Sequence, residues 1–377
     1  MPLNVIGMIG VTRPTGGATV HVIDGGVSPE HLVEYAQIHE RAGFDLVLVG
    51  YTSTSADGWT VATHAAAHTD RLGYLIAHRP GFVSPTLAAR KAATFDRLSR
   101  GRFALHIIAG ASDRDQRRDG DHLDKAGRYA RAAEYIDVMR ATWTATEPFD
   151  HDGTYYQMSD VRSDVLPYQQ PAPPIFFGGS STEAVEMGAA RCDVYALFAE
   201  PRAEIAARFD DYRARAARYG RSASFSLSVR PILGATEGEA WDRANIILAG
   251  IEGDGADRPA PTGAAASAPS RPRRAFDHSG ERMLAHAAAA DVHDERLWMR
   301  IAAATGAPGN TSCLVGTAEQ VADSLLAYYR LGDLSHILIR GFDPLNDATE
   351  FGEELIPRLK AGALAIDAEP PTAGGTP

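Results

Sequence analysis

The segment from Phe177 to Glu183 has the clearest pattern for binding an anion. An apolar run ends there in Gly178 and Gly179, and Ser180 and Ser181 then open a helical pattern. Free backbone N–H groups and hydroxyls at the start of a helix together bind phosphate. A plain helix cap after a tight turn explains the same residues, and the pattern does not say which molecule would carry the phosphate.

A second polar group follows another apolar run. His78 and Arg79 end this run, and Ser84 precedes the next helical pattern. A histidine–arginine pair can hold a planar anionic or carbonyl-rich ring, although a structural loop capped by Ser84 is an equal alternative. His106 lies within ALHII, where a hydrogen-bonded core histidine is favoured over a base. The other histidines lack the spacing of metal ligands, so we expect no metal.

Composition narrows the range of partners. Lysine occurs only at Lys91, Lys125 and Lys360, and the other 34 of the 37 basic residues are arginines. Genome base composition explains this bias, but it also disfavours lysine Schiff-base chemistry and supplies guanidinium groups suited to oxyanions. The net charge of −11 argues against nucleic acid or an anionic membrane as the main partner. Cys192 and Cys313 are expected to be inert core thiols.

The sequence contains no signal for a membrane or for secretion. No apolar run reaches the roughly 18 residues that span a bilayer, and the first ten residues lack the basic stretch of a secretory signal. Hydrophobic residues make up 45% of the 377 positions, enough for a large core. We therefore expect a soluble, cytoplasmic protein that binds a small molecule.

Short apolar runs alternate with helical patterns along the chain. Eight runs are apolar almost throughout, as parallel strands buried on both faces are, and no GxGxxG motif follows the first of them. The sequence therefore predicts an α/β fold, a TIM (β/α)8 barrel with insertions. Chemistry in such barrels takes place at the carboxyl ends of the strands, where both polar groups described above fall. The expected strands are 3–10, 44–50, 72–78, 102–109, 174–178, 193–198, 225–233 and 335–340, and the expected helices are 29–42, 59–69, 86–99, 125–142, 181–190, 202–219, 237–249, 318–331 and 347–360.

Three segments depart from this alternation. Residues 148–174 are predicted to be a turn-rich insertion with a hairpin around Asp152-Gly153. Residues from about 253 to 306 begin with a Gly-, Ala- and Pro-rich stretch, for which a mobile lid is favoured over a linker between domains. Residues 1–366 would then be one barrel domain, and 367–377 a disordered tail.

Two motifs in the chain resemble those of a known protein family. RPGxxSPT spans 79–86 and PPxxFGGSS spans 173–181, and together with the surrounding runs from about Leu3 to Lys360 they resemble the flavin-dependent alkanesulfonate monooxygenases of the bacterial luciferase-like superfamily. The resemblance implies a TIM barrel that takes reduced FMN from a separate NAD(P)H:FMN reductase and uses O2 to oxygenate a small substrate. It also implies a homodimer or homotetramer.

The resemblance assigns roles to particular residues. It places the FMN phosphate at Gly179, Ser180 and Ser181, with Tyr129 reaching it, and lines the flavin with Asp57, Ala109 and Gly110. Arg271, Arg273 and Arg274 of the lid would close over an anion, although a solvated linker is the favoured alternative for them.

Several substrate positions depart from the family pattern. By local alignment, the family's active-site cysteine falls at Ser55, and its arginine and histidine pair falls at Ser228 and Arg230. Its tyrosine after the last strand becomes Phe342, and a tryptophan near the sulfonate becomes Phe198. These changes predict a substrate that is not necessarily a simple alkanesulfonate.

We therefore expect a reduced-FMN-dependent monooxygenase that acts on a small organosulfur compound or another organic acid. Ser55, Arg230 and His78 are the expected catalytic residues, and Arg79, Phe198, Ser228 and Phe342 are the expected substrate contacts. Two alternatives stay open at this point: a deazaflavin-dependent hydride-transfer enzyme of the same superfamily, and a non-catalytic flavin-binding protein.

Overall fold

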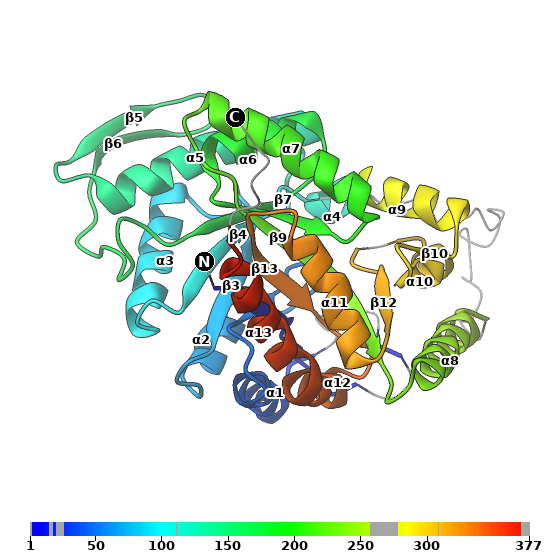
Figure 1. Cartoon of the computed structure of the whole chain (residues 1–377). Helices are drawn as coiled ribbons and strands as arrows, with labels where there is room; N and C mark the ends of the chain where they lie inside the picture. The colour runs from blue at the N-terminus through cyan, green and yellow to red at the C-terminus, as the bar shows by residue number, and fades with distance from the viewer. Residues whose placement is uncertain are drawn as a thin grey trace, which may run out of the picture.

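A closed barrel of eight parallel strands forms the centre of the computed structural model (Figure 1). The structure describes residues 2–14, 18–19, 26–110, 112–256, 278–307 and 309–370. Neighbouring strands pair in the order β1-β2-β3-β4-β7-β8-β9-β13, and β13 pairs with β1 to close the ring. The predicted barrel is therefore confirmed, with all eight expected strands in place. Its strands are β1 (Asn4–Met8), β2 (Leu46–Val49), β3 (Gly73–His78), β4 (Phe103–Ile107), β7 (Ile175–Gly178), β8 (Val194–Phe198), β9 (Phe225–Leu233) and β13 (Leu334–Ile339).

Helices connect the strands and cover the outside of the barrel (Figure 1). The expected helices all occur, although the last one is divided by a short π-helix (Phe351–Leu355). They are α1 (Pro29–Arg41), α2 (Gly58–Ala66), α3 (Pro85–Leu98), α5 (Lys125–Thr144), α6 (Thr182–Arg191), α7 (Arg202–Arg218), α8 (Glu237–Ala256), α11 (Ala318–Tyr329), α12 (Pro344–Glu350) and α13 (Ile356–Asp367). In the part of the chain that the structure describes, no helix has both the length and the apolar character needed to cross a membrane.

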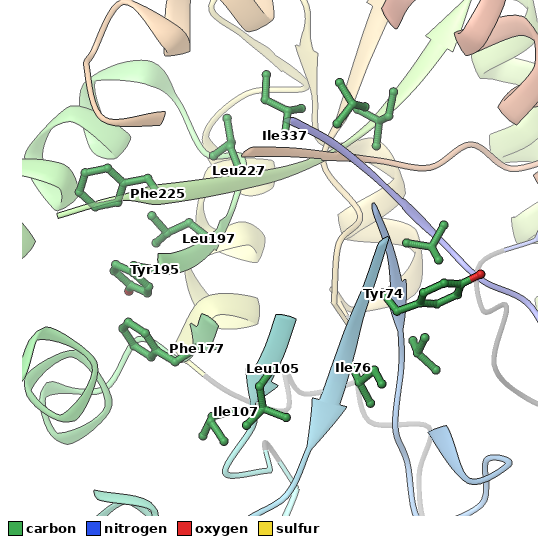
Figure 2. Close-up of a cluster of buried hydrophobic side chains, with 14 of the residues drawn as sticks. Tyr74, Ile76, Leu105, Ile107, Phe177, Tyr195, Leu197, Phe225, Leu227 and Ile337 are labelled. Atoms are coloured by element: carbon green, nitrogen blue, oxygen red, sulfur yellow. The ribbon is translucent and has the colours of Figure 1, made fainter. Parts of the chain in front are cut away.

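Alternation along the strands divides their side chains between two layers. Tyr74, Leu105 and Phe177 point outward and pack beneath the helices, in the cluster that Figure 2 shows. Their neighbours Leu75 and Phe176 point into the barrel and belong to a separate, smaller cluster. Because successive strand residues face opposite sides, this alternation decides which polar side chains can reach the interior.

The insertion before β7 is the predicted hairpin. Strands β5 (Phe149–Asp152) and β6 (Gln157–Val161) pair antiparallel, and the Gly153 amide closes the turn with a 2.9 Å bond to the carbonyl of Tyr156. Glu134 of α5 accepts backbone N–H bonds from Tyr155 and Tyr156, which fixes the hairpin to the barrel.

The expected lid contains ordered elements. Residues 278–306 form α9 (His278–Ala289), β10 (Val292–His293), β11 (Leu297–Trp298) and α10 (Arg300–Thr305). β11 pairs with β12 (Cys313–Gly316), a strand that the sequence did not predict. β12 in turn pairs in parallel with the end of β9, from Arg230 to Leu233, so these strands form an extension of the sheet outside the barrel. Residues 257–277, with Arg271, Arg273 and Arg274, lie outside the described residues, as does the tail from 371 onward.

We predict that Gly7→Ala strongly destabilises the barrel. A Cβ at Gly7 of β1 would lie 2.2 Å from the buried ring of His39 on α1, which has no room to move away. The free energy of unfolding in urea should fall by about 2 kcal/mol or more.

The matched control is Gly250→Ala on α8, where an added Cβ meets nothing within 4 Å. Alanine also favours a helix more than glycine does, so this variant should gain up to about 1 kcal/mol. Equal stabilities for the two variants would contradict the packing of β1 against α1.

Candidate active site

One cavity of about 600 Å³ opens at the carboxyl ends of the barrel strands. Its floor consists of inward-facing strand residues, among them Leu75, His106 and Leu338. Its walls come from the loops that follow the strands, and α9 contributes Ser279 and Arg282. The volume is typical of ligand pockets, which range from about 300 to 1,000 Å³.

The structure brings together most, though not all, of the residues expected at the site. Eight line this cavity: Arg79, Ala109, Gly110, Tyr129, Gly179, Ser180, Phe198 and Ser228. The others, although described, are not among its lining residues: Ser55, Asp57, His78, Ser181, Arg230 and Phe342.

The loop after β7 forms a close-fitting anion cradle. Gly179 has φ +150°, and a Cβ there would lie 2.6 Å from the Tyr129 hydroxyl. The Tyr195 hydroxyl donates to the Gly179 carbonyl over 2.9 Å, which fixes the loop. Ser180 keeps its hydroxyl at the cavity, whereas the Ser181 hydroxyl caps α6 by accepting from the amide of Ala184 over 3.4 Å.

A lysine adds positive charge to the cradle. Lys125, at the start of α5, lines the same cavity and makes no hydrogen bond or ion pair with another described residue. The N-terminal end of the ten-residue helix α6 favours negative charge as well. Together with Gly179 and Ser180, Lys125 can therefore hold a phosphate group.

The loop after β4 is held by a buried arginine. Arg128 donates from Nε to the carbonyl of Ala109 over 2.8 Å and from Nη2 to that of Gly110 over 3.3 Å. Its side chain is fully buried, and Asp113 balances its charge over 2.8 Å. Ala109 and Gly110 thus present a fixed stretch of backbone to the cavity.

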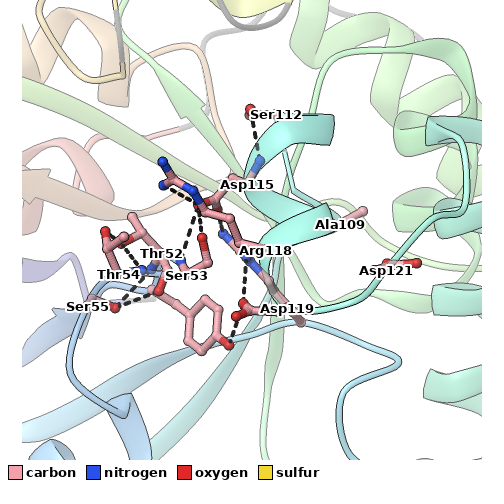
Figure 3. A network of polar contacts seen from close by, with 12 residues as sticks. Thr52, Ser53, Thr54, Ser55, Ala109, Ser112, Asp115, Arg118, Asp119 and Asp121 are labelled. Atoms are coloured by element: carbon pink, nitrogen blue, oxygen red, sulfur yellow. Dashed lines mark hydrogen bonds and ion pairs between the residues drawn. The ribbon is translucent and has the colours of Figure 1, made fainter.

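A polar network forms another part of the cavity wall (Figure 3). Asp115 accepts hydrogen bonds from the hydroxyl of Ser53 and from Arg79, and the Arg79 guanidinium lies 4.5 Å from the centre of the Tyr51 ring. Burial opposes ionisation of Asp115, but the bonds from Ser53 and Arg79 outweigh it and lower the pKa of the carboxyl. Arg79 therefore reaches the cavity already paired, which limits the charge it can offer a ligand.

His106 is a cavity residue that the sequence interpretation placed in the core. It lies on the inward face of β4, beside Gly178, where an added Cβ would be 3.4 Å from its Nε2. Its Nδ1 has no hydrogen-bond partner among the described residues. Burial lowers the pKa of His106 to about 4, so the imidazole is neutral at physiological pH. A neutral ring can donate or accept one hydrogen bond to a ligand.

His78 lies on the opposite side of its strand from the cavity. It shares the outward face of β3 with Tyr74 and Ile76, and it contacts Trp59 of α2 and Tyr135 of α5. Its Nε2 lies 2.8 Å from the Tyr135 hydroxyl. The alternation of β3 places Arg79, and not His78, at the cavity.

Ser55 and Asp57 serve the local fold of the loop after β2. The Ser55 hydroxyl donates to the carbonyl of Thr52 over 2.9 Å, which closes a turn. Asp57 caps α2 by accepting from the amide of Thr60 over 2.8 Å. Ser55 lines a separate void of only about 10 Å³.

Arg230 and Phe342 are buried against each other. Arg230 shares the inward face of β9 with Ser228, but the loops after β1 and β13 cover it. Its guanidinium lies 3.6 Å from the centre of the Phe342 ring and donates to the carbonyls of Thr19 and Gly341 over 2.6 Å each. Burial lowers the pKa of Arg230 well below its ordinary value.

A buried carboxylate that the sequence did not single out holds α9 in place. Glu200 follows β8 and is 1% exposed. It accepts from Arg282 of α9 over 2.9 Å and from Arg208 of α7 over 3.2 Å. Because α9 also donates from Ser279 to Ser180 over 3.0 Å, this cluster supports the cavity wall at the cradle.

Among the described residues, no group of three or more histidine, cysteine, aspartate or glutamate side chains is arranged to hold a metal ion. Both cysteines are free and buried, and burial raises the pKa of Cys313 to about 12.

Comparison with known proteins gives a family and a set of similar structures. A family model described as luciferase-like monooxygenase matches residues 8–335. EDTA monooxygenase from Chelativorans sp. BNC1 is 17% identical, with a TM-score of 0.72 over 98% of this chain and 95% of that one. DmoA from Hyphomicrobium sulfonivorans is 20% identical, with a TM-score of 0.73 over 96% and 88%. An F420-dependent secondary alcohol dehydrogenase is 15% identical, with a TM-score of 0.65 over 95% and 99%. At these identities the three structures show the fold.

We predict that the His78 imidazole stays neutral down to about pH 5. Burial lowers its pKa from 6.5 to about 4, whereas the unfolded chain takes up the proton near pH 6.5. The folded state therefore loses stability as the pH falls from 6.5 to 4. An NMR titration, with the His78 signal assigned by its loss in His78→Gln, should give a midpoint near 4. A midpoint near 6.5 would contradict the buried placement.

We predict that Glu200→Ala loosens α9. The change leaves the charges of Arg282 and Arg208 without their shared partner. Both arginines keep about a quarter of their side chains exposed, so the cost should be about 3 kcal/mol, at the low end for a buried pair. Urea unfolding measures it. Glu204→Ala, at an exposed position on α7, should change stability by less than about 0.5 kcal/mol, and an equal effect of both changes would refute the anchoring role.

Proposed function

The chain belongs to the luciferase-like monooxygenase family, and from this premise we propose that it is the oxygenating component of a two-component flavin system. The expectation of an enzyme of the luciferase-like superfamily is confirmed. In our proposal, a separate NAD(P)H:FMN reductase supplies reduced FMN, and the substrate is a small organosulfur compound or another organic acid. The narrower assignment to the alkanesulfonate monooxygenases stays a prediction.

The anion cradle inside the cavity is the observation that carries this proposal. Gly179 leaves no space for a side chain beside Tyr129, so the backbone can approach a phosphate closely. Ser180 offers a hydroxyl, and Lys125 offers a charge that makes no hydrogen bond or ion pair with another described residue. The cavity volume of about 600 Å³ leaves space for a ring system and a small substrate beyond the phosphate. These residues fit FMN.

The protein's own residues then position and enclose the ligands. When bound, reduced FMN supplies the electrons for oxygen chemistry. Ala109 and Gly110, fixed by Arg128, would lie along the flavin, and the neutral His106 would donate or accept one hydrogen bond at the barrel floor. The α9 helix, anchored by Glu200, would exclude water from the cradle side.

Phe198 and Ser228 are the proposed substrate contacts that the cavity geometry supports. Both line the cavity on the adjacent strands β8 and β9, where they are paired in register. Ser228 also accepts from the Asn310 amide over 2.7 Å, which orients its hydroxyl. Phe342 and Arg230 would affect the substrate only through the loops that cover the barrel mouth.

A second candidate function is hydride transfer with a deazaflavin such as coenzyme F420. The observation that favours it is the similar fold of the F420-dependent secondary alcohol dehydrogenase. Two experiments distinguish the two functions. In the first, the protein is mixed anaerobically with the reduced deazaflavin. In the second, it turns over ¹⁸O₂ with reduced FMN and a panel of C2–C10 sulfonates and carboxylates. Incorporation of ¹⁸O into the product supports the monooxygenase proposal. Turnover that needs no O2 supports hydride transfer.

We predict that the cradle makes the protein prefer FMN over riboflavin, which lacks the phosphate. Charge-assisted bonds are worth about 1.5–3 kcal/mol, so the preference should be roughly 10- to 100-fold for the reduced flavins under anaerobic conditions. Lys125→Gln and Ser180→Ala should each remove a large part of it. To measure binding, the protein-bound flavin is separated from free flavin, reoxidised rapidly and quantified by its fluorescence.

Lys91→Gln is the matched control, because Lys91 packs over Trp59 in the helix layer. This variant should keep the full preference for FMN. Equal affinity of the unaltered protein for FMN and riboflavin would overturn the assignment of the cradle.

A further inference from the structure

A second group of positive charges lines the same cavity on the short helix α4 (Asp113–Arg118). Arg114 and Arg118 both border the cavity, whereas Arg117 does not. The first two are four residues apart and therefore lie on one face of the helix. All three side chains are exposed, so their placement on the helix decides which of them faces the cavity.

The protein itself leaves this charge largely unused. Arg114 makes no hydrogen bond or ion pair with another described residue, and Arg118 approaches only Asp115, at 3.9 Å. Asp115 is already engaged by Arg79 and by the hydroxyl and amide of Ser53. The second carboxylate on this wall, Asp119, also faces Arg79, at 3.6 Å.

The helix that carries the pair is held in a fixed position. Ser112 caps it by accepting from the Asp115 amide over 3.3 Å, and Asp113 pairs with the buried Arg128 over 2.8 Å. Gln116 is buried against Gly110, where an added Cβ would lie 1.7 Å from its Nε2. Figure 3 shows how the loop after β2 meets the helix through Asp115. Because the helix is fixed, no backbone entropy needs to be lost when its arginines bind a ligand.

We propose that Arg114 and Arg118 form a second anion site, which binds the negatively charged group of the substrate. This inference rests on the proposed function, in which the cradle with Lys125 binds the flavin phosphate. With that phosphate bound, Arg114 has no ion pair with a described residue, and Arg118 has only its 3.9 Å pair with Asp115. Guanidinium groups match the planar or trigonal oxygens of carboxylates and sulfonates. In a chain of net charge −11, such a pair selects anions by its local field.

The test is calorimetric titration of the protein saturated with reduced FMN, under anaerobic conditions. The probes are hexane-1-sulfonate, hexanoate and hexan-1-ol, which share one chain length and differ in charge. We expect at least one anion to bind about tenfold or more tighter than the alcohol. That preference should weaken as salt rises from 20 to 200 mM.

The decisive variant is Arg114→Gln/Arg118→Gln, compared with Arg117→Gln on the same helix. The double variant should lose about tenfold or more of the anion affinity, leaving binding of the alcohol and of reduced FMN within twofold. Arg117→Gln should behave as the unaltered protein does. Each single variant at Arg114 or Arg118 should lose part of the affinity, and circular dichroism checks that all variants fold.

The outcomes separate this inference from the proposed function. If neither anion outbinds the alcohol, or if the double variant keeps its anion affinity, the second anion site is refuted. If the double variant loses FMN but not riboflavin, the α4 pair serves the flavin phosphate, and the inference is again overturned. Failure of the unaltered protein to bind reduced FMN would overturn the proposed function itself.

Discussion

The alternation of side chains along the parallel barrel strands is the constraint on which the site depends. In β3 it turns Tyr74 and His78 toward the helices and leaves Arg79 for the cavity. In β4 it turns His106 inward, and in β9 it aligns Ser228 with Arg230. A shift of one residue in any of these strands would exchange the two layers and bury the cavity's polar groups under helices.

The barrel could be predicted from the sequence because its eight strands are apolar almost throughout and alternate with amphipathic helices. The role of His78 depends on the phase of the alternation in β3, which the sequence does not show because this strand is buried on both faces. The two-residue strands β10 and β11 are too short to give a pattern, and the four-residue β12 lies outside the regular alternation of the eight barrel strands. The cover over Arg230 and the ion pairs of Glu200 depend on residues distant in sequence, so no local signal could reveal them.

The charged side chains that line the cavity are mostly positive, whereas the net charge of the whole chain is negative. The net charge is −11, yet Lys125, Arg114 and Arg118 line one cavity, and among the described residues the only ion pair of these three joins Arg118 to Asp115 at 3.9 Å. Most other arginines near the site are paired, as Arg79 is with Asp115 and Arg282 with Glu200. Positive charge that the protein leaves largely unpaired at a ligand site provides binding energy when an anion arrives.

The most direct measurement of the central claim is a crystal structure of the protein with FMN bound under reducing, anaerobic conditions. The account predicts the phosphate within hydrogen-bond distance of the Ser180 hydroxyl and the Lys125 ammonium, with the ring system over the barrel floor near Leu75 and His106. A phosphate seated on Arg114 and Arg118, or a flavin bound outside this cavity, would contradict it.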